Sequence, residues 1–168
     1  MKISMHQASA PRFANALRNL SAILDKAQAW AEVRKIDPAV PGGLRLIADM
    51  LPLSRQVQIA CDTAKGAVAR LAGVEIPKHE DTEQTIPELK ARIAKTLDFI
   101  GSVPAAKLDG SEEREVVLKM RSGEVKFTGL QYLMGHAAPN FYFHCTTAYN
   151  ILRANGVELG KKDFIGTP

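Results

Sequence analysis

Residues 132–156 read YLMGHAAPNFYFHCTTAYNILRANG, and this stretch decides the fold because its apolar side chains recur at helical spacing. At about 100° per residue, one side of such a helix carries Leu133, Ala137, Phe141, His144, Ala148 and Ile151. We expect the helix to extend from about Leu130 to Asn155, with a local distortion at Pro139. The stretch therefore predicts a long last helix with one buried face.

His144 lies at the centre of this apolar stripe. Burying an unpaired polar group is costly, so the ring must be hydrogen-bonded, bound to a metal or open to an internal pocket. Asn140 and His136 precede His144 by four and eight residues, which places all three along the core edge of the helix. This polar ladder is the first candidate site.

Three earlier segments show the same helical period: residues 13–36, 44–72 and 85–100. The first should end before the Pro and Gly residues of 37–43. The second is interrupted at Pro52. The third begins with a capping box formed by Thr85 and Glu88. The sequence thus predicts four long helices in all.

Residues 115–128 break the helical period and predict a short β-hairpin. A two-residue turn at Ser122-Gly123 would place four apolar residues on one face of it. The expected pairs are Met120 with Val125 and Leu118 with Phe127. The hairpin is thus inserted before the last helix.

Four amphipathic helices bury their stripes most simply by packing together, so we predict a mainly all-α, up-and-down four-helix bundle. A chain of 168 residues is the size of one domain, which we place over residues 1–168. The hydrophobic fraction of 46% and charged fraction of 24% are those of a globular protein, which excludes a disordered class.

The charge pattern and the lack of long apolar runs argue against nucleic-acid binding, membrane insertion and secretion. The net charge is +4, but the basic residues alternate with acidic ones instead of gathering on one face, so we expect no nucleic-acid binding. No apolar run is long enough for a membrane span or a secretion signal, and we expect a cytoplasmic protein. Cys61 and Cys145 form no CxxC pair and predict buried, unreactive thiols.

The stretch 132–156 resembles the last helix of the DinB-like, or YfiT-like, superfamily, in which paired histidines four apart precede an Arg and a Gly, here Arg153 and Gly156. Residues 52–60, PLSRQVQIA, followed by Asp62 and Gly73, are similar to the second helix of that fold. Along its whole length the chain resembles an uncharacterised bacterial family of this superfamily. The resemblance implies a DinB-like bundle.

Relatives in that superfamily hold a divalent metal, often nickel or zinc, with three histidines, and some use it to activate a thiol such as glutathione, mycothiol or bacillithiol. The resemblance places His144 at the last ligand position, Asn140 at the position four before it and Gln58 at the second-helix position. Neutral amide oxygens are poor ligands for these metals, so we expect no tightly held ion. Asp62 and His136 are alternative ligands at one and two helical turns from this set.

Three functions remain open, and no catalytic residue is assigned. The leading one is a DinB-like domain that binds a small ligand in the bundle pocket. Its candidate residues are Gln58, Asp62, His136, Asn140 and His144. The second is a metal-dependent thiol transferase or hydrolase of the DinB/YfiT type, and the third is a non-enzymatic homodimeric module with a structural or regulatory role.

A homodimer is expected because aromatic side chains lie on more than one side of the last helix, and because Ile59 lies opposite the main stripe of its own helix. The aromatic residues are Phe141, Tyr142, Phe143 and Tyr149. His79 lies in an acidic connection, where we expect it to be exposed.

Overall fold

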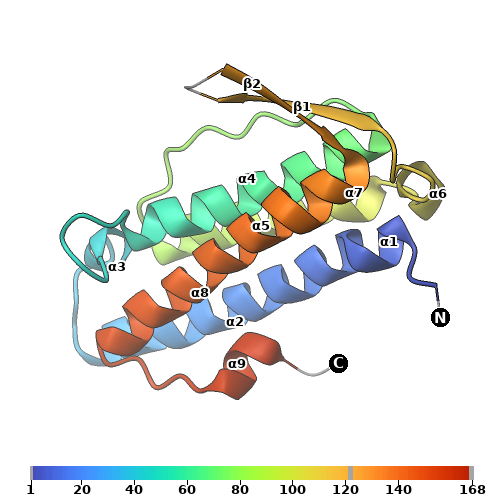
Figure 1. The fold of residues 1–168 in the computed structure, drawn as a ribbon. Coiled ribbons are helices and arrows are strands. Elements are labelled where there is room, and N and C mark those ends of the chain that lie inside the picture. The colour runs from blue at the N-terminus through green and yellow to red at the C-terminus, as the bar shows by residue number, and fades with distance from the viewer. Residues whose placement is uncertain (1, 121–122, 167–168) are drawn as a thin grey trace.

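Four long helices pack side by side in the computed structural model, which describes residues 2–120 and 123–166 (Figure 1). They are α2 (Ala10–Val33), α4 (Leu53–Ala72), α5 (Ile86–Ser102) and α8 (Ala138–Ala154). Short helices join or flank them: α1 (Met5–Ala8), α3 (Val40–Gly43), α6 (Ala105–Leu108), α7 (Gly129–Tyr132) and α9 (Lys161–Ile165). None of the helices in these described ranges is long and apolar enough to cross a membrane.

The order of the long helices departs from strict up-and-down alternation at one step. The connection from α4 to α5 runs back along α4, so these two helices point the same way (Figure 1). The residue numbers of bonded partners increase in the same direction along both segments: Gln58 bonds Glu83, just before α5, and Asp62 bonds Arg92 on α5. Residues 73–85 can make this return because an extended chain advances about 3.3 Å per residue and a helix only about 1.5 Å.

Most predicted helix boundaries hold, with two corrections around the start of α4. Residues 44–52 are not helical, because Pro52 has no amide hydrogen to donate and forces the residue before it into an extended backbone. The Pro-Gly-Gly segment, expected only to break structure, forms most of the short helix α3. At α5, the Glu88 carboxylate accepts from the backbone amide of Thr85 at 2.9 Å, as the capping box predicted.

The last helix is distorted where Pro139 predicted a distortion. A π-helical turn, η1 (Leu133–Ala137), joins α7 to α8 immediately before the proline. A proline inside a helix removes one hydrogen bond and its ring collides with the preceding turn, and a wider π turn accommodates both effects. The helix otherwise continues through Ala154, as expected.

The hairpin consists of β1 (Glu115–Met120) and β2 (Gly123–Thr128), but the predicted register is wrong by two residues. Leu118 pairs with Val125 and Met120 with Gly123, whereas the expected pairs joined Leu118 to Phe127 and Met120 to Val125. Because side chains alternate with a period of two, this shift leaves every side chain on its predicted face, and the apolar pattern could not distinguish the registers. Ser122, the other expected turn residue, lies outside the described residues.

Candidate functional site

His144, the last residue of the predicted polar ladder, is on α8, and its ring faces α4. Its side chain is 8% exposed, and its Nδ1 lies 2.7 Å from Oε1 of Gln56. The amide nitrogen of Gln56 donates to the carbonyl of Leu51 at 2.9 Å, so its oxygen accepts from the imidazole. Burial lowers the pKa of His144 from its ordinary value. His144 is thus buried, neutral and hydrogen-bonded.

The other two members of the ladder have separate surroundings. Asn140 donates to the hydroxyl of Thr63 on α4 at 2.8 Å. His136 lies against the hairpin, stacked at 6.0 Å on Tyr132 and at the same distance from Phe127. The ladder therefore does not converge on one point, because each side chain faces its own partner.

Gln58, which the resemblance assigned to the second-helix ligand position, does not face His144. Gln56 takes that place, and a residue two positions further along a helix lies about 200° around its axis. Gln58 instead points toward the return connection, where its amide nitrogen donates to Glu83 at 2.9 Å and its oxygen accepts from Arg55 at 2.7 Å. Asp62 lies on this same side of α4, with its Oδ1 2.8 Å from both Lys65 Nζ and Arg92 Nη2.

The structure thus divides the five predicted residues among four places. Their donors do not fit a nickel or zinc site, because His144 is the one imidazole among the predicted residues between α4 and α8, and the side chains beside it, Asn140 and Gln56, are amides. Within residues 2–120 and 123–166, no cluster of three or more His, Cys, Asp and Glu side chains is arranged to hold a metal ion.

Arg92 on α5 organises the polar side of α4, and sequence reasoning missed it. Its side chain is fully buried, with Nη2 at 2.8 Å from Asp62 and 2.9 Å from Asp81. Its Nη1 lies 3.1 Å from Glu83. The sequence did contain a signal for it, namely a charged residue on an apolar stripe. Arg92 lies three residues after Leu89, on the apolar face of its helix.

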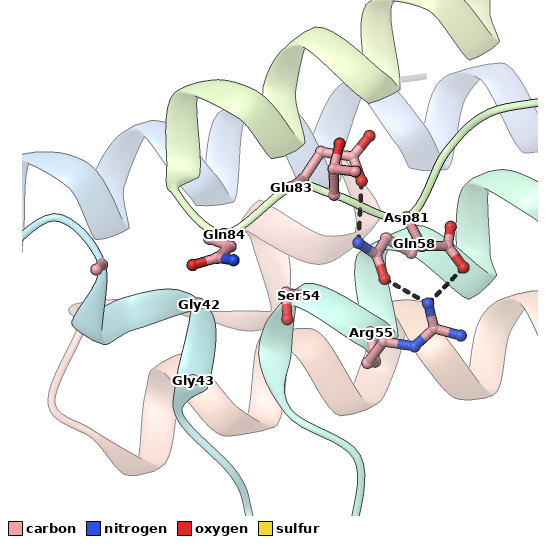
Figure 2. Close-up of a pocket in the computed structure, with 10 residues that line it drawn as sticks. Gly42, Gly43, Ser54, Arg55, Gln58, Asp81, Glu83 and Gln84 are labelled. Atoms are coloured by element: carbon pink, nitrogen blue, oxygen red, sulfur yellow. Dashed lines mark hydrogen bonds and ion pairs between the residues drawn. The ribbon is translucent and has the colours of Figure 1, made fainter.

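This network borders a polar cleft of about 350 Å³ between α3, the first turns of α4 and the segment 81–84 (Figure 2). Figure 2 shows Arg55 turned toward Gln58 and Asp81, with Glu83 on the far side of Gln58. Hydrogen bonding from Arg55 holds the pKa of Asp81 below its usual range. The cleft therefore presents one guanidinium and two carboxylates in fixed positions.

Two glycines of α3 form the opposite wall of this cleft. A Cβ on Gly42 would lie 2.0 Å from the carbonyl oxygen of Gln84, so only glycine allows α3 to approach the segment 81–84 this closely. A Cβ on Gly43 would meet nothing within 4 Å. Gly42 thus sets the width of the cleft, and Gly43 leaves its entrance open.

The two thiols are buried, as predicted. Burial raises the pKa of Cys61 to about 12 and also raises the pKa of Cys145. Both remain protonated near neutral pH, which removes them as nucleophiles.

Comparison with known proteins agrees with this architecture. Residues 5–165 match the model of a family described as a domain of unknown function, DUF1993. A crystal structure of a DinB family member protein from Shewanella denitrificans is 44% identical to the chain. That likeness covers 97% of this chain and 92% of the other, with a TM-score of 0.89. No curated protein matches the chain.

Proposed function

Since the chain belongs to the DUF1993 family and has a DinB-like fold, we propose that it is a ligand-binding domain whose site is the cleft between α3, α4 and residues 81–84. The ligand we propose is a small zwitterion, such as a free amino acid. A cleft of about 350 Å³ suits a molecule of that size.

The proposal depends on one observation, the presence of Arg55, Asp81 and Glu83 together in the lining of a single cleft. Both hydrogen bonds of Arg55 to Gln58 and Asp81 use Nη1, which leaves the Nη2 and Nε donors for a ligand carboxylate. Asp81 and Glu83 are each also paired with Arg92, and their remaining lone pairs are the acceptors that we propose for a ligand ammonium group. The ion pairs hold these groups in place before binding, which reduces the entropy lost when a ligand is fixed.

Gly43→Leu should abolish amino-acid binding, because the new side chain projects into open space at the cleft entrance without disturbing the fold. Gly101→Leu is the matched control, since a Cβ there also meets nothing within 4 Å and the residue lies on α5, outside the lining of the cleft. Calorimetric titration of each variant with a panel of free L-amino acids measures the difference.

Acetate and methylammonium, each with one of the two charges, serve as ligand controls in the same titrations. We expect at least one amino acid to bind the wild type more tightly than either ion, because only a zwitterion engages both Arg55 and the carboxylates. If no amino acid binds, or if Gly43→Leu binds as well as Gly101→Leu, the proposed site is wrong.

The metal-dependent thiol transferase or hydrolase is the competing function, and metal content separates it from ligand binding. Protein purified without a histidine tag should carry zinc or nickel well below one ion per chain, because the side chains beside His144 are amides and His136 lies apart, against the hairpin. Elemental analysis by mass spectrometry makes the measurement. One tightly held equivalent that disappears in His144→Ala would support the metalloenzyme instead.

A homodimer remains part of the proposal. Phe143 on α8 and Met134 on η1 are 55% and 59% exposed, and exposed large apolar side chains of this kind are candidates for an interface. Phe143→Glu should therefore shift the protein from dimer to monomer in light scattering. Val33→Glu, at an 81% exposed position on the end of α2, is the control and should remain dimeric. A monomer mass for the wild type across a broad concentration range would contradict this expectation.

A further inference from the structure

A second cleft lies on the other side of Arg92 from the proposed ligand site. The segment 76–80 of the return connection passes over α4 (Figure 1) and borders an open cleft of about 550 Å³ beside it. The floor is one face of α4, formed by Asp62, Lys65, Gly66 and Arg70. Arg92 bridges Asp62 of this cleft to Asp81 of the first, so the two spaces are neighbours with separate linings.

Positive charge predominates in this second cleft. Lys65, Arg70 and Lys78 line it together with two carboxylates, Asp62 and Glu80. Asp62 is already shared between two cations, since its Oδ1 contacts both Lys65 and Arg92. The Lys65 side chain is only 5% exposed and has two further ammonium hydrogens to donate. The cleft therefore has donors and charge for an anionic ligand.

His79 supplies an independent indication. It was expected to be exposed, but its Nδ1 is buried and has no hydrogen-bond partner within residues 2–120 and 123–166. Buried polar atoms of this kind are rare in folded proteins, and a neutral imidazole carrying its proton on Nδ1 needs an acceptor. Burial, followed by the charges of Lys65 and Arg92, lowers the pKa of His79. An oxyanion bound in the cleft would offset this positive potential at His79.

The Arg70 guanidinium is fixed in position at the end of the cleft by its contacts with Gly66 and Tyr132. A Cβ on Gly66 would lie 2.5 Å from Arg70 Nη1, so the guanidinium rests directly against the helix backbone at this glycine. The same nitrogen donates to the Tyr132 hydroxyl at 3.1 Å. Such fixed placement is typical of an arginine that recognises an oxyanion.

We propose that the cleft formed by Lys65, Arg70, Lys78 and His79 is an oxyanion-binding site that takes a phosphate or carboxylate group. This site does not depend on the zwitterion site, because Gly43 and Arg55 line only the first cleft. The two proposals therefore succeed or fail separately.

The test is an NMR titration of the histidine resonances in a buffer free of phosphate and carboxylates. Inorganic phosphate and acetate are the two probes, and sodium chloride at matched ionic strength is the control. We expect a saturable shift of the His79 resonances and a higher His79 pKa with phosphate, acetate or both, and the stronger of the two identifies the source of the oxyanion. No saturable shift with either probe, or an equal shift with chloride, overturns the proposal.

Variants locate the binding. Arg70→Gln and Lys78→Gln should each weaken binding of the effective probe by about tenfold, while Lys107→Gln, an exposed lysine on α6, should not. Gly66→Ala keeps every charge but displaces the Arg70 guanidinium, and it should weaken binding as well. Binding unchanged in Arg70→Gln and Lys78→Gln overturns the proposal even if His79 responds.

Discussion

Replacing Arg92 with leucine should lower the free energy of unfolding by about 3 kcal/mol. The substitution leaves Asp62, Asp81 and Glu83 close together without the guanidinium that joins them. Asp62 and Asp81 are 40% and 39% exposed, so water partly replaces the lost partner, and the loss lies at the low end for a buried ion pair. Denaturant unfolding measures the change.

Two variants control this result. Arg92→Lys keeps the charge but loses the planar fork, so it should recover only part of the stability. Arg153→Leu makes the same chemical change at an exposed position on α8 and should stay within about 0.5 kcal/mol of the wild type. A loss below about 1 kcal/mol for Arg92→Leu would show that the network contributes little to the fold.

His144→Ala should lower the free energy of unfolding by about 2 to 4 kcal/mol, because it removes buried packing and leaves Gln56 without its partner. His144→Gln or His144→Asn should recover part of this loss by keeping a polar partner. A loss below about 0.5 kcal/mol for alanine, typical of surface positions, would mean that the imidazole faces an open pocket instead.

The same interaction predicts a dependence on pH. The pKa of His144 is lowered in the folded state, whereas in the unfolded chain it is about 6.5. Below about pH 6.5 the unfolded state therefore binds a proton that the folded state does not, and stability falls as pH falls toward the lowered folded pKa. Well above pH 6.5 both states hold His144 neutral, so its contribution to the free energy of unfolding is fully retained. His79 has a lowered pKa as well, so the difference between wild type and His144→Gln isolates the contribution of His144.

Much of the fold was predictable because it is encoded in local periodicity. The apolar stripes, the capping box at Thr85 and the distortion at Pro139 depend on residues within one or two turns of each other. The same periodicity placed His144 in the core without any knowledge of its partner. The hairpin register failed because two registers bury the same faces.

The site was harder to predict because its contacts are tertiary. Helical periodicity places Gln56 and Gln58 on different sides of α4, but it does not say which side faces α8. The same holds for Arg92, whose partners lie on α4 and on the return connection, 30 and 9 to 11 residues away along the chain. Only the direction of α5 relative to α4 brings them together.

The most direct test of the proposed function locates the bound amino acid by NMR. In ¹H–¹⁵N spectra of the wild type titrated with the L-amino acid that binds most tightly, the account predicts saturable shifts in the amides of Gly42, Gly43, Ser54 and Gln84, which line the first cleft. The amides of Thr63, Asn140 and His144, between α4 and α8, should change little. Shifts centred on Asn140 and His144, with the cleft amides unmoved, would contradict it and return the ligand to the polar ladder of the bundle.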